Sequence, residues 1–383
     1  MAHPTYPLLE TFYDSKHRAH VLVDEGEVSL STPLNTLIHF HSNSLFILYL
    51  CFSSSNESFL STQALQPLRP RTHSPLRWDE RYVPYLRRAG MFPLAWVVCA
   101  GLPVMDAPLL SAFVDRWRPE THTFHLPCGE VTITMQDVAM ILGLPLEGNA
   151  VTGIVNGDGW RDTVEAVIGI RPPAPPEGVK DRKTSGVSSA WLKQHFNHCP
   201  QGAAQQVVER HARAWLWHLF GGFLFPDGSG NTISWIVLPI LGQQWENIAQ
   251  YSWGSATLAW MYRQLCDACR RVGNDSNLGG CAYLLQIWIW ERFPVGRPYR
   301  GELEVCVMFL SLFLITSTTL VYLTLTYLLL KPWPHHDEES RPTVAYCWKN
   351  VGAVRGDPVR RYMRYMDDLD CLTQNQVILH RNF

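Results

Sequence analysis

Two cysteines of the sequence have the spacing that could hold a metal ion. Cys266 and Cys269 form a Cys-x-x-Cys pair, which is half of a structural zinc site. The sequence has no second pair of this kind, and both thiols fall inside a predicted helix, where such a pair usually belongs to the core. We therefore predict no metal site; Cys266 and Cys269 would be the candidate ligands if one were present. Conceivable further ligands are Cys281, Cys199, His195 and His198.

Several aspartates could support nuclease chemistry if three of them met around two metal ions. The aspartates considered are Asp106, Asp115, Asp137 and Asp158. Asp106 precedes an Ala-Pro pair as the N-cap of a predicted helix, and Asp137 forms a capping box with Thr134. Both residues therefore have a structural explanation, and we predict no catalytic residue in this chain.

One lysine could serve pyridoxal phosphate, a cofactor that needs a Schiff-base lysine and a phosphate-binding loop. Lys193 lies in a segment that we expect to be ordered, but no Gly-rich loop precedes it. We therefore predict no cofactor. Lys193 is interpreted as a solvated position on a helix whose Trp191, Leu192 and Phe196 face the core.

A set of arginines could instead follow a nucleic-acid backbone. Its members are Arg69, Arg71, Arg77, Arg81, Arg87, Arg88, Arg116 and Arg118. Alternatively, their stems pack on tryptophan faces and their guanidinium groups pair with Asp79, Glu80 and Asp115. The formal net charge of -2 gives the chain no overall basic field, so composition does not decide between the two readings.

The elements that must position these residues are mostly helices. Apolar spacing, caps and glycine stops predict helices at 78–88, 93–100, 109–117, 135–142, 191–197, 203–219, 234–241, 244–250, 253–271, 280–292 and 358–369. Alternation at 121–126 and 130–134, around Pro-Cys-Gly, predicts one β-hairpin. A Pro/Gly/Lys/Ser-rich stretch at 171–189 predicts a surface loop. The expected fold is therefore mainly α, with one small sheet.

Composition bounds the class of protein. With 383 residues, 46% hydrophobic residues and 17% charged residues, the chain has enough apolar surface to exclude disorder as its main state. Ten cysteines are scattered without the density of a disulfide scaffold, and no signal peptide is visible. We therefore expect a reducing compartment, the cytosol or the nucleus.

One apolar stretch stands apart from the rest of the sequence. Residues 305–330 carry no charged side chain, and at about 1.5 Å per residue a helix of this length crosses a hydrocarbon layer of about 30 Å. Hydropathy thus predicts a membrane-type helix here and suggests, as an alternative, a membrane-anchored protein. Arg292, Arg297 and Arg300 precede the stretch and would keep the large domain cytoplasmic.

Several motifs taken together carry a family resemblance. They include LRPR at 68–71, WDERY at 78–82, DRWRPETHTFHLP at 115–127, AWLW at 214–217, LAWMYR at 258–263 and LQIWIWER at 285–292. This pattern resembles the plant mobile domain, also called the aminotransferase-like domain, of the MAIN-like (maintenance of meristems-like) family. The resemblance covers roughly 65–300 and 342–377.

The resemblance implies a mainly helical domain that is shared by transposable elements and host proteins. It implies a nuclear protein that acts in meristem maintenance, genome stability or transposon silencing through protein or chromatin partners. A serine/threonine-phosphatase-type protein is one such expected partner, although this sequence has no phosphatase signature. The family has no established catalytic residues to transfer, so a degenerate nuclease-like or cofactor-dependent enzyme is the other alternative.

The family pattern is interrupted twice in this chain. We predict an N-terminal segment at 1–64 with an insertion at 34–62, a core at 65–300, an apolar insertion with its linker at 301–341, and a truncated C-terminal part at 342–383. Both insertions (34–62 and 302–331) are rich in Ser, Leu, Phe or Thr and share no pattern with their flanks. Our hypothesis is that both are translated intron.

Overall fold

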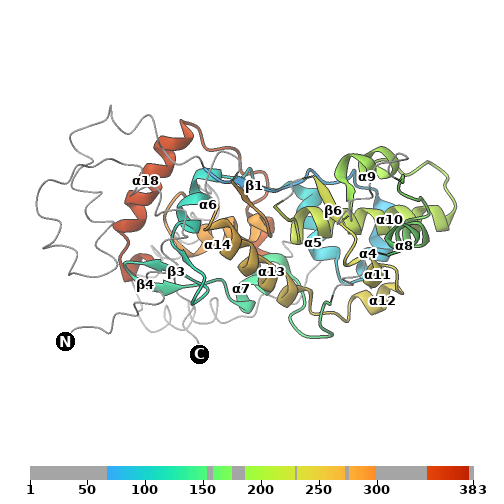
Figure 1. Ribbon diagram of the computed structural model, residues 1–383, viewed down its shortest axis with the longest axis horizontal. Helices are drawn as coiled ribbons and strands as arrows, with labels where there is room; N and C mark the ends of the chain where they lie inside the picture. Colours follow the sequence, from blue (N-terminus) through green and yellow to red (C-terminus); the bar gives the residue numbers. More distant parts are fainter. Residues whose placement is uncertain are drawn as a thin grey trace, which may run out of the picture.

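Helices dominate the computed structural model, which describes residues 67–152, 158–174, 186–228, 231–271, 276–298 and 343–378. Figure 1 shows the helices spread along an elongated molecule, with α18 near one end and α8 near the other. The mainly helical fold that the sequence predicted is confirmed. The structure differs from the prediction in the number of small sheets.

The helices follow the predicted segments, with ends shifted by a few residues. They are α4 (Val83–Arg88), α5 (Phe92–Ala100), α6 (Ala107–Val114), α7 (Met135–Leu142), α8 (Trp160–Ile168), α9 (Ser189–Phe196), α10 (Gln205–Leu219), α11 (Leu238–Leu241), α12 (Trp245–Ile248), α13 (Trp253–Ala268), α14 (Ala282–Arg292), α17 (Val344–Cys347) and α18 (Pro358–Asp370). Short helical turns are η2 (Glu80–Tyr82), η3 (Phe220–Leu224) and η4 (Gln374–Gln376). Helix α8 was not among the predicted elements.

Side-chain caps fix the starts of several helices. The Asp106 carboxylate accepts a hydrogen bond from the backbone N–H of Leu109 at the start of α6. Thr134 and Asp137 form the predicted capping box of α7, and Gly143 ends that helix in a left-handed conformation with φ of 69°. Such caps satisfy N–H and C=O groups that have no partner within the helix.

Three small sheets replace the single sheet that was expected. The predicted hairpin is present as β3 (Thr123–Leu126) and β4 (Gly129–Val131), and β2 (Trp117–Arg118) adds a third antiparallel strand. Strands β1 (Arg69–Pro70) and β7 (Asn277–Leu278) pair in parallel. Strands β5 (Gly186–Ser188) and β6 (Thr232–Ser234) pair antiparallel.

Three sequence predictions were partly wrong because tertiary pairing overrides local patterns. The helix expected at 109–117 ends at Val114, since Trp117 pairs with Phe124 and packs its ring against that residue with centroids 4.9 Å apart. Ser234 belongs to β6 instead of starting a helix, because it pairs with Gly186. That pairing also makes the end of the predicted 171–189 loop a strand, β5.

Tryptophan accounts for much of the core. Eight indoles are among the largest fully buried side chains: Trp117, Trp215, Trp217, Trp245, Trp253, Trp288, Trp290 and Trp348. Buried indoles need a partner for the ring N–H. Trp215 donates to the carbonyl of Leu76, and Trp217 donates to the carbonyl of Ser234. These bonds tie α10 to segments that lie far from it in the sequence.

A buried polar seam joins α18 to α6. Asp106 accepts hydrogen bonds from Tyr365 at 2.7 Å and from Arg361 at 3.1 Å. Asp115 accepts one from Tyr362 at 2.6 Å. Just beyond α6, Arg116 pairs with Asp370 at the end of α18 at 2.5 Å. The segment 343–378 is therefore part of the same core as α6 and α14 (Figure 1).

The predicted insertions at 34–62 and 302–331 lie outside the described residues, as does the apolar stretch 305–330. In the part of the chain that the structure describes, no helix is both long enough and apolar enough to span a membrane.

Candidate functional site

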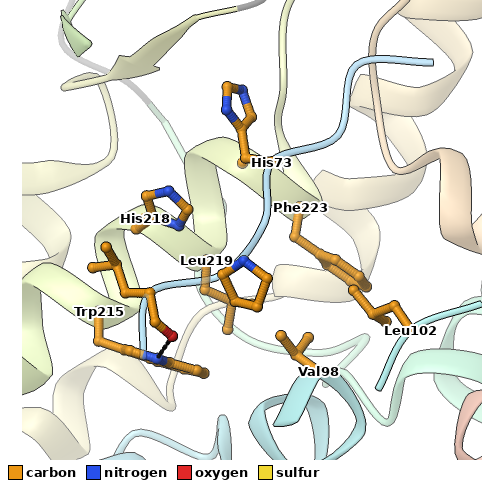
Figure 2. A pocket seen from close by; sticks show the side chains of 10 residues that line it. His73, Val98, Leu102, Trp215, His218, Leu219 and Phe223 are labelled. Atoms are coloured by element: carbon orange, nitrogen blue, oxygen red, sulfur yellow. Dashed lines mark hydrogen bonds between the residues drawn. The ribbon is translucent and has the colours of Figure 1, made fainter. Parts of the chain in front are cut away.

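A small hollow lies between α5, α10, η3 and the segment that follows β1. Its empty volume is about 260 Å³, including the open mouth. The lining residues are His73, Pro75, Leu76, Val98, Leu102, Trp215, His218, Leu219, Gly222 and Phe223. Figure 2 shows the two imidazoles in the upper part of the view and Val98, Leu102 and Trp215 in its lower part. The lining therefore has a polar and an apolar side.

His218 is the most deeply buried polar residue of the hollow, with 2% of its surface exposed. Its Nε2 lies 3.0 Å from the hydroxyl oxygen of Ser189, the first residue of α9. The His73 ring meets the His218 ring edge-on, with centroids 6.1 Å apart. Because α9, α10 and the post-β1 segment each contribute one of these residues, the cluster exists only in the folded chain.

Lys193 extends this cluster toward solvent. It lies one helical turn after Ser189 on α9, so the two side chains share a face of the helix. Its ammonium group donates a hydrogen bond of 2.6 Å to the hydroxyl of Ser74, the neighbour of His73. Lys193 is half-buried, and Leu192 and Phe196 are buried as expected, whereas Trp191 is only half-buried.

The surroundings of the hollow disfavour the charged form of both imidazoles. Burial, with smaller electrostatic contributions from His73 and Lys193, lowers the pKa of His218 to about 3. Burial and the charge of Lys193 also lower the pKa of His73, with Asp227 acting in the opposite direction and Arg71 adding to the decrease. Removal from water disfavours a charged imidazole, and nearby cations disfavour it further.

A π-helical turn shapes one wall of the hollow. Helix α10 continues into η3 (Phe220–Leu224), and turns of this kind are frequent at functional sites. A methyl group on Gly222 would lie 3.0 Å from Cβ of His73, and one on Gly221 would lie 2.6 Å from Cγ2 of Ile233. The two glycines therefore permit His73 and β6 to approach the turn closely.

The Ser189–His218 pair has the residue types of a nucleophile and its base, but its environment does not suit that role. A general base works best when its pKa lies near the operating pH, and that of His218 is about 3. Ser189 is also buried, with 7% of its surface exposed. In chemical terms, the arrangement offers hydrogen-bond donors and positive charge instead of a nucleophile.

The candidate zinc ligands lie at the end of α13. Cys266 accepts a hydrogen bond from the indole N–H of Trp117 at 3.3 Å, and the Cys269 thiol donates to the carbonyl of Cys266. Burial raises the pKa of both thiols, that of Cys269 to about 12, so neither favours the thiolate that binds metal. Among the described residues, no group of three or more His, Cys, Asp or Glu side chains could hold a metal ion.

The aspartates considered for nuclease chemistry are engaged in holding the fold. Asp106 and Asp115 accept hydrogen bonds from tyrosines of α18. Asp137, besides capping α7, forms an ion pair with Arg292 of α14. Asp158 is exposed, two residues before α8 and next to its N-cap Gly159. The structure thus gives separate partners to the three buried carboxylates.

The predicted arginine set is distributed over several elements. Arg81 forms an ion pair with Asp79, as the alternative reading expected, and Arg88 pairs with Glu246. Arg116 is buried and pairs with Asp370, and Arg87 lies over the ring of Phe92. Figure 1 shows α4, which carries Arg87 and Arg88, far from the β3–β4 region beside which Arg116 and Arg118 lie. Nucleic-acid binding by this set stays a prediction.

Sequence reasoning did not identify the hollow. His73, Ser189 and His218 come from three separate segments, and no local motif connects them. One signal was present in the sequence, because the Gly221-Gly222 pair follows a helical pattern directly and marks a close approach of another backbone or side chain.

Comparison with known proteins gives a family match and several relatives. The model of the plant mobile domain matches residues 94–379. "Serine/threonine-protein phosphatase 7 long form homolog" of Arabidopsis thaliana is 45% identical over 196 residues, which are 51% of this chain and 14% of that protein. "Protein MAINTENANCE OF MERISTEMS" of the same plant is 37% identical over 205 residues, 54% of this chain and 41% of that protein.

"Protein MAIN-LIKE 1" of Arabidopsis thaliana is also similar, with 40% identity over 199 residues, 52% of this chain and 38% of that protein. The matched part thus covers less than half the length of each of these relatives. No solved structure is significantly similar to the chain.

Proposed function

This chain belongs to the plant mobile domain family, and from that premise we propose that it is a non-enzymatic binding module of a nuclear protein. Its role would be in meristem maintenance, genome stability or transposon silencing. The name of one relative, "Protein MAINTENANCE OF MERISTEMS", supports the first of these roles.

The proposal that this chain is not an enzyme rests on the hydrogen bonds that its buried carboxylates accept. A two-metal nuclease needs several carboxylates that converge on one open position. Here Asp106, Asp115 and Asp137 each accept hydrogen bonds from a different tyrosine or arginine. Carboxylates that accept such hydrogen bonds stabilise the fold. Their structural role favours a protein that acts by binding partners at its surface.

We propose a protein of the serine/threonine-phosphatase type as the partner of this surface. The support is that a domain similar to this chain makes up 14% of a relative named as a phosphatase 7 long form homolog. Domains that occur joined to one another in one protein often work together in others. In this proposal, the chain contacts nucleic acid or chromatin in complex with this partner.

Complementation tests the nuclear role. The full chain, fused to a fluorescent protein, would be expressed in Arabidopsis plants that lack MAINTENANCE OF MERISTEMS. We expect nuclear accumulation, a restored meristem and reduced transposon transcripts. Exclusion of the fusion from nuclei would contradict the proposal, as would nuclear accumulation at normal levels without restoration of either phenotype.

A further inference from the structure

We propose that Ser74 is a phosphorylation site for a proline-directed protein kinase, and that Lys193 holds the phosphate group once it is attached. Ser74 is exposed and is not among the residues that line the hollow, so the modified side chain would lie at the surface. This inference goes beyond the proposed function and does not depend on it.

The sequence around Ser74 has the form that such kinases select. Pro75 follows directly, and Arg77 comes three positions after the serine. A proline leaves no backbone N–H without a partner in the kinase groove, and a guanidinium group at the third position can pair with acidic groups of the kinase. Ser74 is the only serine of the 383-residue sequence that precedes a proline. Thr32 is the only threonine that does so, and it has Asn35 in place of the arginine.

The fold presents the recognised residues to solvent. Ser74, Pro75 and Arg77 are exposed, and the stretch that contains them forms neither helix nor strand. Leu76 between them is buried, and its carbonyl accepts a hydrogen bond of 3.1 Å from the indole N–H of Trp215. The stretch is therefore anchored through a residue that the kinase does not select, and the selected side chains remain accessible.

Lys193 of α9 is already placed to receive a phosphate group on Ser74. Its ammonium group donates a hydrogen bond of 2.6 Å to the Ser74 hydroxyl. Asn197, the C-cap of the same helix, accepts one of 3.1 Å from the backbone N–H of Arg77. Helix α9 thus lies beside this stretch of chain, and a phosphate group on Ser74 would be within reach of the flexible lysine side chain.

The charges around Ser74 favour an added phosphate group. Lys193 and Arg71 both act as cations on the neighbouring His73, and Asp227 is the carboxylate that opposes them there. A phosphoserine carries a charge of about -1.5 to -2 at pH 7 and offers three acceptor oxygens. Lys193 would then donate to a charged acceptor instead of a neutral hydroxyl, and such hydrogen bonds are roughly twice as strong. Phosphorylation should therefore fasten this stretch more firmly to α9.

The reaction is a phosphoryl transfer for which the kinase supplies the catalytic groups. The hydroxyl oxygen of Ser74 attacks the γ-phosphorus of ATP, and a new O–P bond forms. The bond between that phosphorus and the β–γ bridging oxygen breaks, and ADP leaves. The hydroxyl proton passes to the catalytic aspartate of the kinase. Lys193 releases the hydroxyl during the transfer and contacts the phosphate oxygens afterwards.

The first test treats the full chain with ATP and a purified cyclin-dependent kinase, which belongs to the proline-directed class. Peptide mapping by mass spectrometry locates the phosphoryl group. We expect it on Ser74, with none at this position in Ser74→Ala and transfer slower by about tenfold or more in Pro75→Ala, which keeps the serine. Thr32→Ala is the control and should leave the transfer to Ser74 unchanged. Absence of phosphate on Ser74 in the wild-type chain, or undiminished transfer in Pro75→Ala, would overturn the proposal.

A second measurement tests the contact with Lys193. Phosphorylation should raise the midpoint of thermal unfolding of the full chain by about 2–4 °C. Lys193→Gln should accept the phosphoryl group but show no such rise. Lys349→Gln is the control and should keep the rise, because Lys349 is exposed and donates to the Tyr346 hydroxyl instead.

Each phosphorylated chain is compared with its own unmodified form, so the effect of the substitution itself on stability cancels. An equal rise in Lys193→Gln and in the wild-type chain would overturn the assignment of Lys193 as the group that holds the phosphate. Absence of a rise in the wild-type chain would overturn it as well.

Discussion

Buried polar side chains of this protein form hydrogen-bonded pairs. Some of these pairs could be predicted from the sequence and others could not. The capping roles of Asp106 and Asp137 were predicted because a cap is a local pattern of three or four residues. The second partners of the same carboxylates, Tyr365 and Arg292, were not predicted. They come from distant parts of the chain, and a single sequence has no signal for contacts of that kind.

The bond between Tyr365 and Asp106 can be tested by removing one hydroxyl group. Tyr365→Phe should lower the free energy of unfolding by about 2 kcal/mol, because a buried hydrogen bond to a carboxylate is lost. Urea denaturation measures the change. Tyr346→Phe is the control, because among the described residues that hydroxyl is bonded to exposed Lys349, and its loss should change stability by less than about 0.5 kcal/mol. Equal losses in the two variants would refute this account of the seam.

The buried imidazole of His218 makes stability depend on pH. Its pKa in the folded chain is about 3, below the ordinary 6.5, so its contribution is complete above pH 6.5 and is lost as the pH falls toward 3. Each pH unit in this window lowers stability by up to about 1.4 kcal/mol. Between pH 7 and pH 5 the wild-type chain should lose roughly 2 kcal/mol more than His218→Gln. Parallel stability curves would show that His218 is not the buried group responsible.

At the scale of elements, prediction succeeded where a pattern is local. The β3–β4 hairpin and the long helices α10, α13 and α14 follow periods that the sequence displays directly. Strands β1, β5, β6 and β7 have only two or three residues each and exist through pairing with a distant partner. The hollow also depends on long-range contacts. Its η3 wall and His73 are far apart in the sequence, and the tertiary fold has to bring them together.

The glycine pair of η3 provides a test at this scale. Gly221→Ala would place a methyl group 2.6 Å from the fully buried Ile233 side chain, so we expect a loss of about 1–3 kcal/mol. Thermal unfolding followed by circular dichroism measures it. Gly352→Ala is the matched control, since an added methyl group there meets nothing within 4 Å. A destabilisation of the control as large as that of Gly221→Ala would contradict the packing argument.

At the scale of the whole molecule, the family match and the shared core point to one domain. The matched residues 94–379 run across the predicted insertion at 302–331, and segments on both sides of it contribute to the same hydrophobic core. Trp348, for example, donates a hydrogen bond to Glu291 of α14. The uncharged apolar stretch 305–330, which suggested a membrane-anchored protein, lies outside the described residues.

Our hypothesis that 34–62 and 302–331 are translated intron predicts that neither is needed for folding. Within the described residues, the hollow and the α6–α18 seam are formed by side chains outside these two stretches. A chain that lacks both should therefore keep its helical circular dichroism and its unfolding midpoint. Loss of cooperative unfolding in the shortened chain, with the full-length chain as reference, would refute the hypothesis.

We propose above that this domain acts by binding a partner of the phosphatase type, and this binding can be measured directly. The most direct measurement is a calorimetric titration of the purified full chain with the purified Arabidopsis phosphatase 7 long form homolog, with an unrelated phosphatase as control. We predict saturable binding to the homolog and none to the control. Absence of heat with a folded chain, or equal heat with both phosphatases, would contradict the claim.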